Sequence, residues 1–557
     1  MEVNEKITNL LLSHLQGKNG DNSIIINALY TLLNGHYVKY DFNDNFATLS
    51  GKVTDDNAFQ KILSTLNEKT AKRKVNGVYY TPKDVVEYII YNTVIMNVLP
   101  ELSKTFKKAD AENLLFKLDE MVLNTLLFKK TFIDPTCGSG EFLISVFELK
   151  MSLLSHFNLL SDTNLLLICK TIFGNDIDED STDICKIRLF FAVAKFLKNE
   201  TSLDKLATIL KAQFYNEDFV LFKGLENKSF DIIVGNPPYV EYGQFKGKEN
   251  LANNFGNIYA DVIKNSITIL KPNGSFGFIT PLSYTATARM GCIRQYIKDN
   301  TYKQYILNFA DRPDCLFQGV HQKLNIIIAN KGKNKEQEIY TSSYKHWYKE
   351  ERSQLLNGCE IIRAKENYIE FIPKIGNELE QSIFNKVVSV DGHSLYSLQS
   401  KMDSEPIYLN MRACFWIKAF TFNPGSNEYK AFYYYKDLKS FFFCILNSSL
   451  FWLYWTIVSD CWHITSKELK GFAVSKLPSK LQITNFDKLL KNLETKLEET
   501  KKYIGSKQTE YEYKHKDCKA EIDAIDDALV SIFEFTKDEL TYIKNFAKKY
   551  RMGGENE

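Results

Sequence analysis

Short apolar runs alternate with longer amphipathic stretches through the middle of this 557-residue chain. The runs are rich in Ile, Val and Phe, as buried strands are, and they cover residues 131–135, 171–177, 230–236, 274–281, 305–311 and 324–330. Helical patterns such as residues 141–157 and 182–198 separate them. Strands that alternate with helices predict an α/β fold with a mostly parallel, doubly wound sheet. Such a sheet binds its ligands beyond the carboxyl ends of its strands.

The pattern changes on both sides of this region. Residues 1–74 have a polar, helical character and predict an N-terminal accessory region. The alternating pattern predicts one domain over residues 75–335. Residues 336–480 carry aromatic clusters without strand–helix alternation, which predicts a second domain. Residues 481–557 have leucines at helical spacing and predict a C-terminal helical region.

The most apolar stretch, residues 441–458, is interrupted by Asn447, Ser448 and Ser449. A membrane span needs roughly 20 uninterrupted apolar residues, so we expect buried core here and no membrane partner. The ten cysteines are scattered without zinc-site spacing, which argues against a metal site and a disulfide framework and favours a reducing cytoplasm. The net charge of +2 neither indicates nor excludes a nucleic-acid partner, because phosphate contacts need only a local basic surface.

Three polar clusters follow the predicted strands. In "DPTCGSGEFL", residues 134–143, a glycine turn joins a strand to a helix and lets backbone approach a ligand. The turn lacks both the GxGxxG spacing and the lysine of pyrophosphate-binding loops. Asp176 follows the next strand, where a carboxylate can accept hydrogen bonds from ribose hydroxyls. In "NEDFV", Asp218 can accept a hydrogen bond from an exocyclic amine and Phe219 offers a flat wall. Each cluster alone is more often an ordinary turn or helix cap, but together they suit a nucleoside without phosphates, such as S-adenosylmethionine.

The run "FDIIVGNPPYV", residues 230–240, ends a hydrophobic strand in an unusually rigid turn. Two consecutive prolines remove two backbone donors and fix two φ angles, which is costly beside a buried strand. An amide side chain and a phenol flank the prolines, at Asn236 and Tyr239. The turn therefore calls for a functional reason.

Taken in order, these motifs resemble those of N6-adenine DNA methyltransferases of the γ motif order, found in bacterial restriction–modification systems. Residues 77–90, "GVYYTPKDVVEYII", resemble the upstream cofactor motif of that family, and residues 134–143 resemble its methionine-binding loop. The segment "LNSSLFWLYWTIVSDCW" with "ITSKELKGF" resembles its target-recognition domains. The resemblance implies a Rossmann-like methyltransferase sheet, an α+β target-recognition domain over residues 336–480 that binds DNA, and a C-terminal helical segment.

The resemblance also implies S-adenosylmethionine as the cofactor. The positions that match the cofactor motifs of the family are Thr81, Pro82, Asp134, Pro135, Cys137, Gly138, Gly140, Phe142, Asp176, Asp218 and Phe219.

The same resemblance implies transfer of a methyl group to adenine N6. The Asn236 side-chain oxygen and the Pro237 main-chain oxygen would accept the two N–H groups of the target amine, and the Pro237–Pro238 pair would preorganise these acceptors. The target base would flip out of the duplex and stack on Tyr239. A second aromatic wall is expected near Phe317 or His321, although Phe317 is better interpreted as a core side chain.

Other enzymes share this turn, because a glutamine side chain in a protein and an adenine in RNA also present a planar NH2 group. More than 200 residues follow the predicted sheet, enough to wrap a duplex, which favours double-stranded DNA over RNA and over protein amides. The intact Asn236 and Tyr239 argue against a non-catalytic subunit. A fused nuclease is not expected, because the first 75 residues hold no convincing acid pair followed by ExK on a strand; a cognate restriction endonuclease would be a separate protein. Dependence on a separate specificity subunit is a less favoured alternative. The prediction is a cytoplasmic, site-specific adenine DNA methyltransferase that needs no metal.

Overall fold

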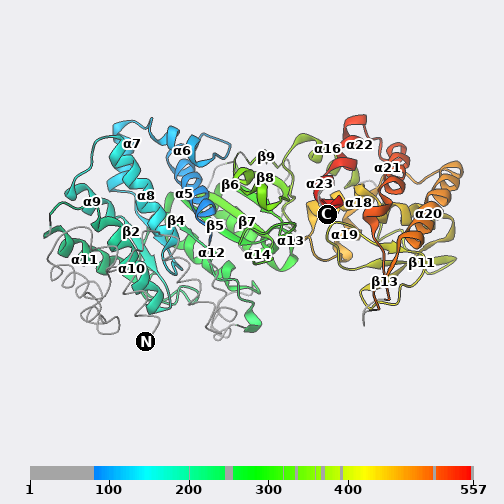
Figure 1. The fold of residues 1–557 in the computed structure, drawn as a ribbon, viewed down its shortest axis with the longest axis horizontal. Coiled ribbons are helices and arrows are strands. Elements are labelled where there is room, and N and C mark those ends of the chain that lie inside the picture. Colours follow the sequence, from blue (N-terminus) through cyan, green and yellow to red (C-terminus); the bar gives the residue numbers. More distant parts are fainter. Residues whose placement is uncertain are drawn as a thin grey trace.

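The computed structural model describes residues 81–553, apart from residues 200, 245–254, 318, 333–335, 358, 365–369, 389–392 and 506–509. The predicted accessory region, residues 1–74, lies outside the described residues. Two lobes lie side by side (Figure 1). The N-terminal lobe holds a large sheet, and the C-terminal lobe begins near helix α16 (Glu378–Val387).

The strands of the N-terminal lobe form one sheet in the order β3-β2-β1-β4-β5-β7-β6-β8-β9. Neighbours from β3 to β5 run parallel, whereas β7 is antiparallel to both β5 and β6. This confirms the predicted α/β, doubly wound, Rossmann-like sheet. The strands are β1 (Phe132–Asp134), β2 (Ile172–Asn175), β3 (Phe214–Tyr215), β4 (Phe230–Gly235), β5 (Leu270–Pro281), β6 (Thr301–Phe309), β7 (Leu324–Lys331), β8 (Glu338–Lys345) and β9 (Ile362–Arg363).

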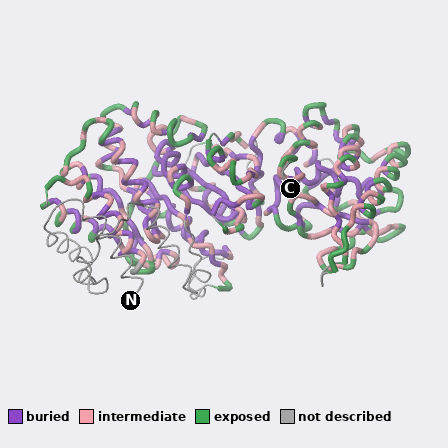
Figure 2. Tube along the Cα trace, in the orientation of Figure 1, coloured by how far each residue is buried: buried purple, intermediate pink, exposed green. Residues whose placement is uncertain are grey.

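Helices cover both faces of this sheet. Helices α5 (Lys83–Val98), α8 (Glu141–His156) and α10 (Glu179–Ala194) pack with one face in a hydrophobic cluster that continues into the C-terminal lobe. Helices α12 (Ile258–Ile269) and α14 (Gly291–Asn300) pack with the other face in a second cluster. Figure 2 shows the buried chain running through the centre of both lobes. The other helices of this lobe are α6 (Lys108–Leu115), α7 (Glu120–Phe128), α9 (Asp162–Cys169), α11 (Thr201–Gln213), α13 (Ser283–Ala286) and α15 (Arg352–Leu355).

The sheet extends past residue 335, where the sequence predicted the end of the catalytic domain. Strand β8 pairs parallel with β6, and β9 pairs antiparallel with β8. The sequence pattern missed β8 because "EIYTSSYK" is mostly polar and has no apolar run. Serine and threonine are nonetheless buried in this strand, at Thr341 and Ser342.

The C-terminal lobe combines small sheets with helices. One sheet has the order β12-β11-β13, with β11 (Ser404–Asn410), β12 (Ala419–Phe420) and β13 (Tyr429–Tyr435). Two strand pairs accompany it, one of β10 (His393–Ser394) with β14 (Ala473–Val474) and one of β15 (Lys502–Tyr503) with β16 (Tyr511–Glu512). The helices after α16 are α17 (Lys439–Asn447), α18 (Ser449–Val458), α19 (Ser466–Gly471), α20 (Lys480–Thr500), α21 (Lys519–Phe533), α22 (Lys537–Asn545) and α23 (Lys548–Met552).

The apolar stretch 441–458 forms α17 and α18, and every residue of α18 is buried. This confirms the prediction of buried core. No single helix in the described ranges has the length and apolar composition to cross a membrane. The α17–α18 pair passes such a test by length and composition only, with a bend of 61° between its two halves.

Candidate active site

A buried asparagine holds together the three loops at the carboxyl ends of β1, β2 and β3. The Asn175 side-chain amide donates to the main-chain oxygens of Pro135 (2.9 Å) and Glu217 (3.1 Å), and its oxygen accepts the Glu217 N–H (2.9 Å). The Cys137 N–H donates to the Asn175 main-chain oxygen at 2.8 Å. Asn175 is 1% exposed, so these bonds are shielded from water. The three predicted cofactor loops are therefore brought to one place.

The glycine turn between β1 and α8 needs both of its glycines. Gly138 has φ +49° and Gly140 has φ +93°, a region that L side chains rarely adopt. A Cβ at Gly140 would collide with Cys185 of α10, whereas a Cβ at Gly138 would meet nothing within 4 Å. The turn therefore packs tightly on its Gly140 side and is open beside Gly138, where a ligand can approach the backbone.

Asp176 faces this turn. Its Oδ2 accepts the Gly138 N–H at 2.8 Å, and its Oδ1 accepts the Asp178 N–H at 2.9 Å. Burial raises the pKa of the Asp176 carboxyl to about 6. A carboxylate has about four lone-pair sites, so two acceptor positions remain for hydroxyl groups of a ligand.

The carboxyl group of Asp134 lies directly under the end of β4. Burial raises the pKa of Asp134 well above its ordinary value, and the Thr136 N–H donates to its Oδ1 at 3.0 Å. A Cβ at Gly235 would come within 2.6 Å of that Oδ1, so only glycine fits where β4 ends. The Asp134 side chain therefore fixes the strand end that leads into the Asn236 turn.

Several predicted cofactor residues are buried and shape the site from within. Phe142 and Cys137 are 2% and 5% exposed. Phe219 is 3% exposed and packs edge-to-face on Phe222. Asp218 is half-buried, and its Oδ1 accepts the Leu221 N–H at 3.0 Å, which leaves acceptor capacity for a ligand.

The Asn236–Tyr239 turn is tied to the start of α5. The Asn236 side-chain amide donates to Thr81 Oγ1 at 3.0 Å, and Thr81 is buried just before Pro82, which caps α5. Two motifs far apart in the sequence thus meet at the amide. Pro237 is buried and Pro238 is half-buried.

Tyr239 is held at both ends of its side chain. Its hydroxyl donates to the Ile279 main-chain oxygen of β5 at 3.0 Å, and its ring contacts Tyr259 edge-to-face at a centroid distance of 6.4 Å. The side chain is half-buried. These contacts fix the orientation of the ring.

The two candidates for the second aromatic wall differ in their surroundings. Phe317 is 1% exposed and lies in the main hydrophobic cluster. His321 is exposed, and its Nδ1 lies 2.9 Å from the Asp311 main-chain oxygen. Phe317 is thus a core side chain in this structure, and His321 is at the surface.

Sequence reasoning missed two residues of this site. One is Asn175, whose position in the strand-end motif "GNDI" was a usable signal. The other is Ile177, which is 69% exposed directly after Asp176. A large apolar side chain left in water beside a polar cluster is a signal that only the structure supplies.

Residues 170–315 match the model of the Eco57I restriction-modification methylase family. RM.Eco57I of Escherichia coli, a type II restriction enzyme and methyltransferase, is 25% identical over 358 residues, which are 56% of this chain and 33% of that protein. Modification methylase CviBIII of Paramecium bursaria Chlorella virus NC1A is 28% identical over 232 residues, 41% of this chain and 42% of that one. Type II methyltransferase M.PaeR7I of Pseudomonas aeruginosa is 22% identical over 224 residues, 37% of each chain. The chain thus spans well under two thirds of these relatives.

A solved structure of the type IIL restriction-modification enzyme MmeI in complex with DNA has the same fold, with a TM-score of 0.51. It is 12% identical in sequence and covers 99% of this chain and 98% of that one. The family match lies on the part of the chain that includes Asp176 and the Asn236–Tyr239 turn. Residues 170–315 of this chain are therefore similar to the Eco57I restriction-modification methylase family, in the region that contains the candidate site.

Proposed function

We propose that this protein is a site-specific DNA methyltransferase that transfers a methyl group from S-adenosylmethionine to N6 of a flipped adenine. The proposal rests on one observation. The Asn236–Tyr239 turn, the open turn at Gly138 and the Asp176 carboxyl group lie at the same edge of the sheet. Of the relatives, RM.Eco57I is named as both restriction enzyme and methyltransferase. The proposal for this chain covers modification; restriction would be the task of a cognate endonuclease.

The residues present fit S-adenosylmethionine. The open side of Gly138 admits a ligand to the backbone, Asp176 keeps acceptor positions for ribose hydroxyls, and Ile177 offers an apolar surface for the adenine ring. Asp218 would accept a hydrogen bond from the adenine amine. Asp134, Pro135, Cys137, Gly140 and Phe142 would shape the methionine end, and Phe219 would back the adenine from the core. When bound, the cofactor supplies an electrophilic methyl group on a sulfonium.

The turn residues would activate and position the amine. The Asn236 side-chain oxygen and the Pro237 main-chain oxygen would each accept one N–H of the adenine amine, which favours the tetrahedral nitrogen that attacks the methyl carbon. Methyl transfer to this nitrogen would break the methyl–sulfur bond with its electron pair left on sulfur, and the extra proton on the nitrogen would leave to water. The rigid Pro237–Pro238 pair keeps the acceptor in place before the base arrives, and Tyr239 would stack on the base.

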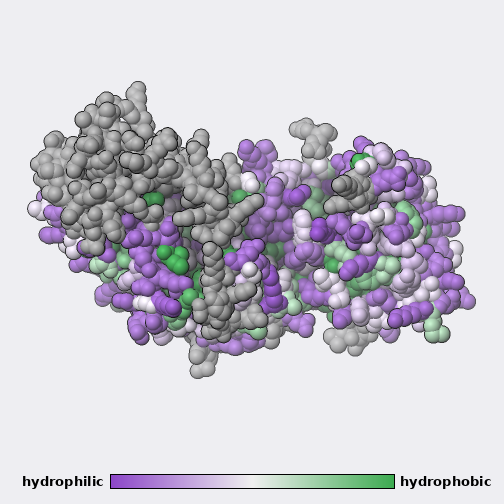
Figure 3. Space-filling model, turned by 90° about the horizontal axis from the view of Figure 1, so that it is seen from below, coloured by the Kyte–Doolittle hydropathy of each residue, from purple (hydrophilic) through white to green (hydrophobic). Residues whose placement is uncertain are grey.

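The C-terminal lobe would read the DNA sequence. Tyr433 and Tyr435 alternate along β13 and are 47% and 48% exposed, and Tyr396 is 44% exposed with the Lys470 ammonium 4.8 Å from its ring centroid. Exposed aromatics beside lysine suit contacts with bases and phosphates. Where the described residues are visible from below, the surface is mostly hydrophilic, with small hydrophobic patches (Figure 3).

Single-molecule sequencing of genomic DNA tests the proposal. Cells that express the wild-type protein should carry N6-methyladenine at one sequence motif, and cells that express Asn236→Ala should carry none. Unmodified DNA in both would overturn the proposal. Labelled methyl transfer to RNA or to protein glutamine amides would then identify the alternative substrates.

A further inference from the structure

The loop between β6 and β7 meets the segment after α18 at the junction of the two lobes. The Lys323 ammonium lies 4.5 Å from the ring centroid of Trp462, and it pairs with Asp311 at 3.3 Å. Trp462 is 37% exposed. An exposed indole with a cation against it therefore stands where the lobes join.

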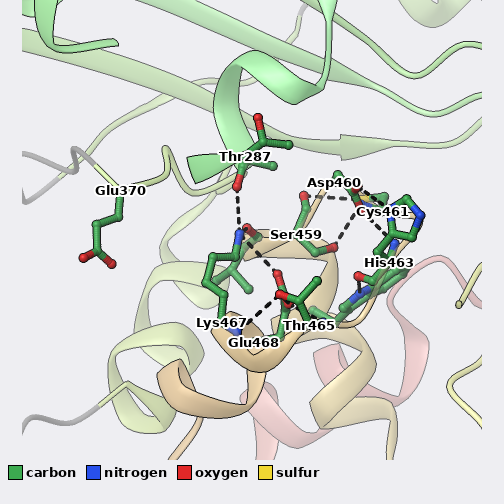
Figure 4. A network of polar contacts seen from close by, with 12 residues as sticks. Thr287, Glu370, Ser459, Asp460, Cys461, His463, Thr465, Lys467 and Glu468 are labelled. Carbon is green, nitrogen blue, oxygen red and sulfur yellow. Dashed lines mark hydrogen bonds and ion pairs between the residues drawn. The ribbon is translucent and has the colours of Figure 1, made fainter. Parts of the chain in front are cut away.

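The backbone around Trp462 is fixed. The Trp462 N–H donates to Asp460 Oδ1 at 2.9 Å, and the Ala413 N–H donates to the Trp462 main-chain oxygen at 3.1 Å. Lys467, a few residues on, donates to the main-chain oxygen of Ala286 across the lobe junction at 2.8 Å. Figure 4 shows this segment, with Lys467 beside Thr287 of the N-terminal lobe. The ring is thus presented by a rigid support.

This position is close to the proposed target-base turn. The Leu282 N–H donates to the Lys323 main-chain oxygen at 2.9 Å, and Leu282 comes directly after β5. The Tyr239 hydroxyl donates to Ile279 on the same strand. Leu282 and Ile279 are three residues apart in the sequence, so the main chain of Lys323 and the hydroxyl of Tyr239 are both held at the same end of β5.

Cations and carboxylates lie together around Trp462: Lys323 pairs with Asp311, and Asp460 accepts the Trp462 N–H and lies 2.8 Å from His463 Nδ1. Arg312, in the same loop as Lys323, is exposed, and the Arg412 side chain is 57% exposed in its pair with Glu428. Arg412 also forms an isolated bridge with His463. Aromatic rings interleaved with Arg and Lys are the combination that nucleic-acid surfaces use for bases and phosphates.

We propose that Trp462 is a stacking platform for a base of the target strand that flanks the flipped adenine. Arg312 and Arg412 would bind the neighbouring phosphates. The Lys323 ammonium would contact the opposite face of the indole and fix the orientation of the ring. This inference rests on the proposed function, since it assigns a DNA contact outside the pocket for the target base.

The test uses the full chain and a duplex that contains the motif found by sequencing, with 2-aminopurine placed singly at each position flanking the target adenine. Trp462→Ala and Trp462→Leu remove the stacking surface, and Trp462→Phe keeps an aromatic face. Tyr503→Ala, which removes a 70%-exposed aromatic of β15, is the matched control. Affinity for S-adenosylmethionine reports whether each variant is folded.

We expect one flanking 2-aminopurine to be quenched by the wild type and by Trp462→Phe but not by Trp462→Ala or Trp462→Leu. Affinity for the duplex should fall roughly 5- to 150-fold in the last two, the range for loss of one base–aromatic stack, with cofactor affinity unchanged. Wild-type quenching and affinity in Trp462→Leu would overturn the platform while leaving the methyltransferase proposal intact. A wild-type protein that binds no duplex and methylates no DNA would overturn both. A duplex affinity that stays normal while binding of another protein is lost would assign Trp462 to a protein partner instead.

Discussion

Thr81 and Asn236 lie 155 residues apart in the sequence, and a 3.0 Å hydrogen bond joins Asn236 Nδ2 to Thr81 Oγ1. Because the amide nitrogen is committed to Thr81, the amide plane is fixed and its oxygen is directed elsewhere. The cofactor motif at the start of α5 is thus coupled to the turn proposed to hold the target amine.

Thr81→Val should lower kcat while leaving cofactor affinity within twofold, because the amide of Asn236 loses its anchor. A hydrogen bond of this kind is worth about 1 kcal/mol net, so we expect roughly a fivefold fall. Thr81→Ser, which keeps the hydroxyl, should retain activity. Steady-state kinetics with calorimetry of S-adenosylmethionine binding would check this. If Thr81→Val instead weakened cofactor binding at unchanged kcat, Thr81 would act on the cofactor directly.

Asn236→Ala should lose turnover and keep cofactor binding, because the Asn236 oxygen is proposed to act on the transition state. Removing one preorganised group of this type costs about 10²- to 10³-fold in kcat. Asn236→Asp keeps an acceptor oxygen but loses the donor to Thr81, so its kcat should lie between that of the wild type and that of Asn236→Ala. Single-turnover methyl transfer at saturating cofactor measures the step directly. Normal turnover in Asn236→Ala would refute the role.

Tyr239→Phe should be mild, and Tyr239→Ala should not. The first change removes only the hydrogen bond to the Ile279 oxygen, whereas the second removes the stacking face. Loss of a base–aromatic stack predicts a fall of roughly 5- to 150-fold in kcat/KM for Tyr239→Ala. The two variants should bind S-adenosylmethionine equally. Equal losses of kcat/KM in both would show that the hydroxyl, and not the ring, matters.

Affinity for S-adenosylmethionine should rise between pH 5 and pH 7. The pKa of Asp176 is about 6 in the folded protein, above its ordinary value, so Asp176 gains its charge in this interval. The ionised carboxylate is the better acceptor for hydroxyl groups, and the gain should be about tenfold if only that form binds. Calorimetric titrations across this interval, with Asp176→Asn as the control, measure the effect. A slope that persists in Asp176→Asn would assign it to another group.

Ionisation of the Asp176 carboxyl group should lower the stability of the folded protein, although it raises the affinity for the cofactor. A folded-state pKa raised above the unfolded value means that the folded state binds the proton more tightly, so ionisation between about pH 4 and pH 6 lowers the free energy of unfolding. Without cofactor, Asp176→Asn should therefore flatten the decline of stability across this interval. Urea unfolding of both proteins at several pH values would check it. A steeper decline in the variant would contradict the assignment.

Replacing Tyr433 and Tyr435 together by alanine should weaken DNA binding and leave the cofactor site untouched. Both side chains are about half exposed on β13, so their loss should not disturb the core. We expect the affinity for the methylation motif to fall more than the affinity for unrelated DNA. Competition binding with both duplexes measures the difference. An equal fall for the two duplexes would indicate phosphate contacts and not sequence reading.

The strands that carry the site could be predicted from the sequence because they are apolar and followed by polar motifs. Strand β3 was missed because it has only two residues, and β8 because its buried serine and threonine look polar. The burial of Phe317 and the exposure of Ile177 depend on tertiary packing, which composition does not reveal. The hydrogen bond between Thr81 and Asn236 could not be predicted either, because no local sequence pattern pairs residues that lie so far apart in the chain.

Strands β8 and β9 also bear on how this protein can be engineered. Helix α18 of the C-terminal lobe packs against β8, so the lobe proposed to read DNA rests on a strand of the catalytic sheet. An exchange of specificity modules between relatives that cuts at residue 335 would strip that strand from the sheet. A crossover placed after β9, beyond Arg363, would leave the sheet whole. The recognition lobe would then be exchanged as one unit.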